Sequence, residues 1–449
     1  MDAHLIDSSI YGDLWSTEFS RSLFAERARL SRWLDVIAAL ARAQASVGII
    51  PGASAAAISD LRAEDIDIRR VAEGTRETSH STLGLIRELQ RLLPETAREH
   101  VYVGATVQDV TDTAAALEMA QVGQYIWTDL RAIEASLIQL TITHRATPMV
   151  GRTHGQPGAP ITFGFKTASW LDEIGRSLER MGEVKNRCLM AQLGGAVGSL
   201  AFFGEQALPL RKAFATEINL SEPRISWLTA RDRLAEFGGT LTLATAALAR
   251  MANEVFTLQR AEIGEVIEAS SATTVGSITM PHKLNPERSE QVVTLARLVR
   301  SNSSSLSETM VQEHERDARG WKAEWVTLPT ICHYATATTA LSRQLVDGLS
   351  VSSEAMLANI HAAGSVHSEQ LLRRLSTRLG KHAAQAALHE AYRVARSAEQ
   401  PLAEALSHVA TPDELQELTS VETGSCVEMA DAIVTAAEAR RSNESASWR

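Results

Sequence analysis

The feature that most constrains the fold of this chain is an apolar seam of about five helical turns between residues 241 and 258. Its members recur at alternating intervals of three and four residues, and they are Leu241, Ala244, Leu248, Met251, Val255 and Leu258. This spacing puts one apolar side chain per turn on the same face of an α-helix, as in a coiled coil. A helix this long cannot cover its stripe within one small domain. The seam therefore predicts a bundle of long helices that continues across the subunits of a homo-oligomer.

The composition supports a helical fold. Aromatic residues make up only 5% of the 449 residues, whereas alanine and leucine are abundant. Pleated sheets favour aromatic and β-branched side chains, and alanine and leucine are among the best helix formers. We therefore expect an all-α protein.

The charge balance limits the partners of the chain. Its formal net charge is −10, and no basic stripe or arginine-rich tail stands out. A surface of this kind does not favour nucleic acid, because binding to phosphates depends on basic residues that release counterions. We expect no nucleic-acid partner and a small anionic substrate held in a locally cationic pocket.

Cysteine usage and the N-terminus indicate the compartment. Cys188, Cys332 and Cys426 lie far apart and match no metal-ligand spacing, so buried thiols in a reducing compartment are expected, without a disulfide or zinc. The segment 1–4 lacks a basic region followed by an apolar run, and no uncharged stretch reaches membrane-spanning length. We predict a cytoplasmic protein with no membrane partner.

Breaks in the helical patterns predict three helical domains. Residues 19–49 give a helical pattern that ends at a glycine, followed by a Pro-Gly turn. The expected boundaries are 1–103 for an N-terminal domain, 104–350 for a central bundle of long helices and 351–449 for a C-terminal domain. The glycine-rich segment 194–199 is predicted to be a turn, and the basic tail 440–445 is expected to fray.

One segment concentrates polar residues of several kinds. Residues 276–286 read G-S-I-T-M-P-H-K-L-N-P, and Glu290 follows four residues later. The preceding run 270–274 consists mainly of serine and threonine, which are poor helix formers, whereas Pro281 and Pro286 fix φ around the polar residues. This composition is typical of an active-site lid, and we refer to 270–288 as the signature loop.

The pattern G-S-x-x-M-P-x-K-x-N in this loop resembles the signature of the aspartase/fumarase superfamily, whose members eliminate a group β to a carboxylate and usually release fumarate. The resemblance implies that Ser277 is the catalytic base and that Lys283 and Asn285 hold the substrate carboxylate. A serine hydroxyl is a weak base in water, so closure of the loop must exclude water and stabilise the alkoxide. Ile278 stands where the family usually has a second serine.

A second segment, G-R-T-H-G-Q-P at 151–157, resembles the R-T-H segment of the same family. The resemblance implies that His154 donates a proton to the leaving group and that Glu290 polarises it. A carboxylate beside an imidazole fixes its tautomer and favours its protonated form. Arg152 and Gln156 are expected to bind substrate. Without the resemblance, a lone histidine in a glycine-rich segment is more often structural.

A third segment, G-A-T-V-Q-D-V-T-D-T at 104–113, resembles the family segment that binds a substrate carboxylate through adjacent threonine and serine hydroxyls. Thr106 is kept, but Val107 replaces the serine and cannot donate a hydrogen bond. Ala230 likewise stands where relatives commonly carry glutamine. Both departures fall at substrate-contact positions, so we expect a substrate other than the commonest one of the family.

Two further segments divide the resemblance between two branches of the superfamily. His80, in the sequence E-T-S-H-S, matches a histidine that adenylosuccinate lyases use near the leaving nitrogen, with a helix cap or surface histidine as the alternative. The segment 314–329 begins His-Glu-Arg, as in adenylosuccinate lyases and 3-carboxy-cis,cis-muconate cycloisomerases, and its continuation W-x-A-E-W-x-T-L-P is similar to the cycloisomerases. Arg316, with Arg319 and Lys322, is expected either to bind a di- or tricarboxylate or to form a solvated face.

The resemblance implies an all-α homotetramer in which each active site draws on three subunits. The expected reaction is a β-elimination from an N-substituted aspartate that gives fumarate and an amine through an aci-carboxylate. Thr106 would help to stabilise this intermediate, and His80 would assist His154. No cofactor is expected, because the substrate carboxylate is the electron sink and the sequence has neither a dinucleotide fingerprint nor a metal cluster.

Two alternatives remain open from the sequence. The retained histidines favour the lyase, whereas the segment 321–329 favours a cycloisomerase that lactonises a carboxymuconate. A non-catalytic member of the superfamily is the second alternative, although the joint retention of the expected base, acid and carboxylate-binding residues argues against it.

Overall fold

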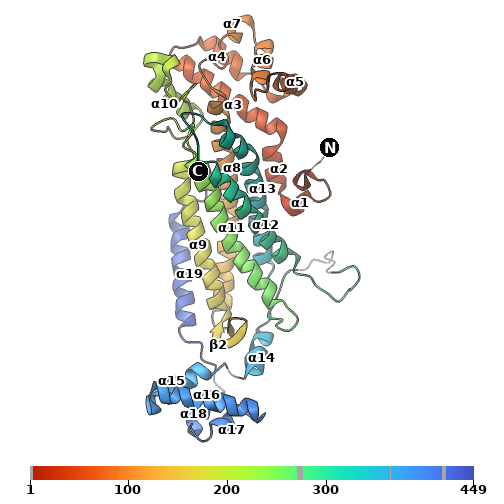
Figure 1. The fold of residues 1–449 in the computed structure, drawn as a ribbon, viewed down its shortest axis with the longest axis vertical. Helices are drawn as coiled ribbons and strands as arrows, with labels where there is room; N and C mark the ends of the chain where they lie inside the picture. Colours follow the sequence, from red (N-terminus) through yellow and green to blue (C-terminus); the bar gives the residue numbers. More distant parts are fainter. Residues whose placement is uncertain (1–3, 270–276, 365, 417–420, 449) are drawn as a thin grey trace.

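The computed structural model describes residues 4–269, 277–364, 366–416 and 421–448. The chain is 69% helical, so the predicted all-α class is confirmed. Figure 1 shows a long column of helices with a small helical unit at each end. Residues 270–276, the first part of the signature loop, lie outside the described residues.

Five long helices form the column (Figure 1). They are α8 (Val107–Thr143), α9 (Phe163–Cys188), α11 (Asp232–Leu258), α12 (Glu287–Glu308) and α13 (Ala318–Asp347). The predicted seam lies on α11, and each of its six members exposes at most 1% of its surface. These side chains share one core with residues of α8 and α13 such as Ile133 and Ile331. The prediction of long, closely packed helices is confirmed.

The helical unit before the column has its own core. Its elements are α3 (Glu26–Ser46), α4 (Gly52–Ser59), η2 (Ala63–Asp65), α5 (Ile68–Thr78), α6 (Leu83–Leu92) and α7 (Glu95–Arg98). The preceding η1 (Leu5–Asp7), α1 (Gly12–Trp15) and α2 (Glu18–Phe24) instead pack against the core of the column, for example through Ile6 and Leu23. Two later elements, η3 (Ala201–Gln206) and α10 (Ala207–Glu217), join this unit through Phe203, Leu210 and Phe214. The N-terminal core thus includes residues well beyond the expected boundary at 103.

Two short antiparallel sheets interrupt the helices. β1 (Pro148–Thr153) pairs with β2 (Gln156–Thr162), and β3 (Val266–Ile267) pairs with β4 (Ser350–Val351). His154 and Gly155 form the two-residue turn between β1 and β2, with φ of 54° and 74°. Positive φ at both positions is the geometry of a type I′ turn, which matches the twist of a hairpin. This hairpin follows the C-terminal end of α8 and holds His154 at its tip.

The chain forms a second small unit after the column. Its helices are α14 (Ser353–Ala363), α15 (Ser368–Leu379), α16 (Lys381–Ser397), α17 (Leu402–Leu406) and α18 (Pro412–Gln416). Leu371, Leu375 and Leu388 lie in its core. The last helix, α19 (Cys426–Asn443), leaves this unit and packs along α9 and α8 in the column (Figure 1).

The basic tail is ordered rather than frayed. Arg440 and Arg441 donate hydrogen bonds at 2.9–3.0 Å to Glu134, a fully buried carboxylate on α8. Trp448 is also fully buried, and its indole Nε1 donates to the carbonyl oxygen of Met181 at 2.6 Å. An unpaired buried carboxylate would be costly, so these contacts hold the end of the chain against the bundle.

Two other expectations concern the cysteines and membrane-spanning segments. The three cysteines are buried as predicted, and burial raises the pKa of Cys188 to about 12. Across the described ranges, every helix is too short or too polar to cross a membrane.

Candidate active site

The first group of predicted residues meets at the N-terminus of α8. Thr106 is the N-cap residue, and Arg316 donates from Nη1 to its hydroxyl oxygen at 2.5 Å and from Nε to Oε1 of Gln108 at 2.8 Å. Gln108 in turn donates to the carbonyl oxygen of Leu228 at 3.1 Å, which fixes its amide. We call Thr106, Gln108 and Arg316 the anchor cluster. A guanidinium beside the free N–H groups of a helix N-terminus is suited to bind a carboxylate.

A buried carboxylate holds the backbone around the anchor cluster. Asp109 accepts hydrogen bonds from the backbone N–H groups of Thr106 at 2.9 Å, Gly194 at 2.7 Å and Gly195 at 3.1 Å. Burial penalises the carboxylate more than these donors stabilise it, which raises the pKa of Asp109 to about 7. The predicted turn at 194–199 is confirmed, and Asp109 attaches it to the start of α8.

A second buried network fixes the start of α13. The Arg231 guanidinium lies between Asp112 on α8, at 2.7 Å, and Glu324 on α13, at 2.9 Å, and all three side chains are nearly inaccessible. Trp321 donates from Nε1 to Asp112 at 3.2 Å. Ala230, by contrast, is exposed. The network holds the helix that follows Arg316 in a fixed position relative to α8.

Val107 and Ala230 are the two departures from the family pattern at substrate-contact positions, and they differ in exposure, because Ala230 is exposed and Val107 is buried. The Val107 side chain is buried in the core, so it presents no surface to a ligand. The Thr106 hydroxyl instead receives a hydrogen bond from Arg316. Arg316 therefore supplies a charged donor beside Thr106, whereas Val107 supplies none.

His80 lies between α5 and α6 and caps a helix. Its Nδ1 accepts from the backbone N–H of Leu83 at 3.2 Å and of Thr82 at 3.4 Å, at the start of α6. Because Nδ1 is the acceptor, the neutral ring carries its proton on Nε2, and the side chain is exposed. His80 therefore caps α6 through Nδ1, and its Nε2 can still bind a substrate or donate a proton.

The hairpin carries a second group of predicted residues. Arg152 donates to Glu265 at 2.7 and 3.0 Å, and Asn359 donates to the same buried carboxylate at 2.8 Å. This two-point ion pair holds the hairpin against β3 and α14. His154 and Gln156 are exposed, and neither side chain has a hydrogen-bond partner among the described residues. We call these three predicted residues, Arg152, His154 and Gln156, the hairpin cluster.

The signature loop carries the third group, Ser277, Lys283, Asn285 and Glu290, which we call the loop cluster. Ser277 Oγ accepts a hydrogen bond from the backbone N–H of Met280 at 3.0 Å. Such a donor stabilises an alkoxide, which is what a serine base requires. Asn285 donates to Glu287 at 3.1 Å, and Lys283 and Glu290 are exposed.

One chain does not bring these three clusters together. The anchor cluster lies at the start of α8, and the hairpin begins five residues after this helix ends. With 37 residues, α8 is about 55 Å long. The loop that carries Ser277, Lys283 and Asn285 projects from the side of the column, and Glu290 lies in the first turn of α12 (Figure 1). Sequence reasoning named Thr106 and Arg316 in the anchor cluster but gave Gln108 and Asp109 no role.

The fold and the site residues define a class of enzyme. The chain belongs to the lyase family, within the aspartase/fumarase superfamily, because the lyase family model matches residues 16–300. It is 37% identical to N-acetyl-S-(2-succino)cysteine lyase of Dickeya dadantii, over 87% of this chain and 86% of that protein. It is also 37% identical to 3-carboxy-cis,cis-muconate cycloisomerase of Pseudomonas aeruginosa, over 81% of this chain and 80% of that protein.

A solved structure supports the same family. The 3-carboxy-cis,cis-muconate lactonizing enzyme from Pseudomonas putida matches with a TM-score of 0.89 and 32% identity, over 96% of this chain and 99% of that one. The family resemblance and the fold expected from the sequence are thus confirmed.

Proposed function

We propose that this protein catalyses a cofactor-free β-elimination from a 2-substituted succinate, releasing fumarate and a thiol or amine. The observation that carries the proposal is the anchor cluster, in which Arg316 and the N-terminus of α8 converge on Thr106. This arrangement provides charge-assisted donors for one substrate carboxylate in a protein whose net charge is −10.

The chemistry requires a base at the carbon next to a carboxylate. The Ser277 alkoxide removes a proton from this carbon, and the electron pair delocalises into the carboxylate to give an aci-carboxylate. Lys283 and Asn285 stabilise the charge that develops there, and the Met280 N–H lowers the cost of the alkoxide. The electron pair then forms the C=C bond as the bond to the leaving atom breaks.

An acid must protonate the departing atom. His154, oriented by Glu290 and assisted by His80, gives its proton to the leaving sulfur or nitrogen. The proton held by Ser277 then returns to His154 through solvent, so the sum is substrate to fumarate plus the protonated leaving group. No electrons are gained or lost, and no oxidant or reductant is needed.

The three clusters must come from different copies of the chain. A 37-residue helix separates the anchor and hairpin clusters by far more than the length of a small dicarboxylate. We therefore propose a homotetramer in which three subunits supply one cluster each. Exposed apolar side chains on the signature loop, such as Ile278 and Leu284, would be covered by such contacts.

The relatives bear on the identity of the leaving group. The relative from Dickeya dadantii is named a lyase of an S-(2-succino) thioether, which favours a carbon–sulfur bond over the carbon–nitrogen bond expected from the sequence. A second candidate is lactonisation of a carboxymuconate, favoured by the segment 321–329 and by the Pseudomonas putida structure. Both reactions use the same anchor for a carboxylate.

Fumarate release tests the function directly. We would follow the absorbance of fumarate with N-acetyl-S-(2-succino)cysteine and with N-substituted aspartates, and lactone formation with 3-carboxymuconate. Ser277→Ala is expected to lower kcat by about 10³-fold or more, because it removes the base. Thr279→Ala, an exposed side chain in the same loop, is the matched control and should stay within about threefold of the wild type. Equal turnover by Ser277→Ala and the wild type would overturn the assignment.

A further inference from the structure

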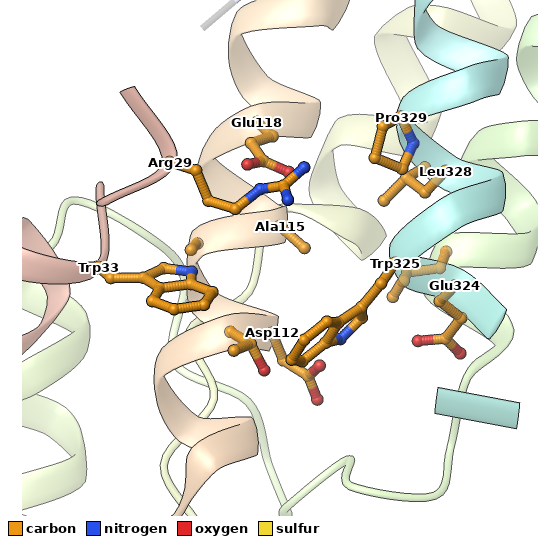
Figure 2. Close-up of a pocket in the computed structure, with 12 residues that line it drawn as sticks. Arg29, Trp33, Asp112, Ala115, Glu118, Glu324, Trp325, Leu328 and Pro329 are labelled. Carbon is orange, nitrogen blue, oxygen red and sulfur yellow. The ribbon is translucent and has the colours of Figure 1, made fainter. Parts of the chain in front are cut away.

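A cavity between the helices has no role in the chemistry described so far. It encloses about 80 Å³ between α3, α8 and α13 (Figure 2). Its lining includes Arg29 and Trp33 from α3, Thr111 from α8, and Trp325 and Leu328 from α13. We call it the indole cavity. One water needs about 10–15 Å³ of such space, so the cavity has room for a chain of several non-hydrogen atoms.

Its apolar walls are built mainly from indoles. The rings of Trp33 and Trp325 lie 6.4 Å apart and both are half-buried, and Trp321 packs edge-on against Trp325 at 5.0 Å. Figure 2 shows Trp33 and Trp325 on opposite sides of the opening between the helices. A chain with only 8 tryptophans places two of them across this space, where they offer large, rigid apolar contacts at little cost in side-chain entropy.

The acidic groups in the lining are already paired. Asp112 and Glu324 both bind the buried Arg231 guanidinium. Glu118 accepts two hydrogen bonds from Arg32, at 2.8 and 3.2 Å. These carboxylates are therefore not available to attract a cation.

Arg29 remains as the charged donor of the cavity. Its guanidinium makes no hydrogen bond to any residue in the described ranges, although its charge favours the ionised form of Glu118. Figure 2 shows the side chain extending over the cavity toward α8. The lining thus combines an apolar body with a cation whose donors are unused, which suits an apolar group that ends in an anion.

The cavity and the anchor cluster lie along the same helix. Gln108, which binds Arg316, and Glu118, beside Arg29, are ten residues apart on α8, or about 15 Å along its axis. A substrate bound at Arg316 through one carboxylate of its 2-succino group would extend its leaving group past Thr111 and along the two indoles toward Arg29.

We propose that the indole cavity is the leaving-group subsite and that it selects an elongated, apolar thiol or amine with a terminal anion. The proposal rests on the proposed function, because it assumes a succinyl carboxylate at the anchor cluster. It adds a specificity that the elimination chemistry does not require.

Two substrates that differ in one group test this selection. They are the S-(2-succino) adducts of mercaptooctanoic acid and of mercaptooctanol, which have the same chain length with and without the terminal carboxylate. The wild type is expected to show a kcat/KM about tenfold higher or more for the acid, the effect of one charge-assisted contact. Equal kcat/KM for both adducts would overturn the subsite without any variant.

A variant locates the effect at Arg29. Arg29→Gln should remove the preference for the acid by lowering its kcat/KM to that of the alcohol, while the value for the alcohol stays within about twofold. Arg42→Gln, an exposed arginine on the same helix, is the matched control and should keep the preference. A preference that survives in Arg29→Gln would contradict the proposal. Absence of fumarate from both adducts, from N-acetyl-S-(2-succino)cysteine and from the N-substituted aspartates in the wild type would instead overturn the proposed function, and the subsite with it.

Discussion

Arg316 links the sequence prediction to a specific contact. The sequence left open whether this arginine binds substrate or forms a solvated face, and the structure places its guanidinium on Thr106 and Gln108 at the start of α8. The planar guanidinium of Arg316 donates to the Thr106 hydroxyl oxygen and to the Gln108 amide oxygen. It still has N–H groups that can bind a substrate carboxylate.

Replacing Arg316 by lysine tests the importance of the planar guanidinium. An ammonium on a flexible stem cannot hold Thr106, Gln108 and a carboxylate in one plane, so Arg316→Lys should lower kcat/KM for fumarate release by about 10–100-fold. Arg300→Lys, at an exposed position on α12, controls for the substitution itself. Activity within about twofold of the wild type in Arg316→Lys would show that the anchor cluster is not the carboxylate site.

The residues around Arg316 show what the sequence could and could not predict. Asp109 follows Thr106 at the spacing of a capping box, a signal that was available and that explains its contact with the Thr106 N–H. Its contacts with Gly194 and Gly195 depend on a turn 85 residues away, and no local pattern predicts them. Gln108 likewise depends on the carbonyl oxygen of Leu228.

At the scale of the elements, the long helices were predictable and the hairpin was not. The seam on α11 repeats over several turns, so its period identifies the helix. β1 and β2 are short, and their sequences contain glycine and proline, which strand propensities do not favour. Their pairing depends on the His154–Gly155 turn.

The return of α19 to the column was missed for a different reason. Arg440 and Arg441 resemble a solvated tail in the sequence, and only the folded chain reveals that they neutralise Glu134, some 300 residues earlier. Ion pairs between residues so distant in the sequence leave no local pattern.

Two substitutions of His80 test whether its side chain both caps α6 and takes part in the reaction. His80→Asn keeps a side-chain oxygen that can cap α6, so its free energy of unfolding should stay within about 0.5 kcal/mol of the wild type. His80→Ala should lose about 1 kcal/mol. Both variants should lower kcat by about 100-fold if the imidazole assists proton transfer. Wild-type kcat in His80→Asn, measured beside its urea denaturation curve, would leave His80 only the capping role.

The contact between α2 and α13 should respond to pH. His333 on α13 is buried against Phe24, and its Nδ1 lies 2.9 Å from Ser20 Oγ on α2. Burial, with a smaller contribution from the charge of nearby Arg21, lowers the pKa of His333 to about 4. Between the unfolded pKa near 6.5 and the folded one, the unfolded chain binds a proton that the folded chain does not.

The stabilisation from neutral His333 is therefore present above about pH 6.5 and is lost as the pH falls toward 4, by up to about 3 kcal/mol. Urea denaturation across this range measures it. His333→Gln keeps a hydrogen-bonding group without titrating, so its free energy of unfolding should fall less than that of the wild type. Parallel curves for the two proteins would show that His333 does not titrate in this way.

At the scale of the whole molecule, the residues expected to form one active site, apart from His80, lie in three separate clusters. The anchor and hairpin clusters are at opposite ends of α8, and the loop cluster is on the side of the column (Figure 1). The superfamily resemblance implied a site shared by three subunits, and the separation within one chain gives a physical reason for such an assembly.

The most direct measurement of a shared site is complementation between two inactive variants. Ser277→Ala lacks the base on the loop cluster, and His154→Asn lacks the acid on the hairpin cluster. The two would be unfolded together at equal concentrations, refolded, and assayed for fumarate release beside each variant refolded alone. Random assembly gives a site an intact loop in half the cases and an intact hairpin in half, so about a quarter of wild-type activity should return if different chains supply them. Activity no higher than that of the separate variants would contradict a site shared between chains.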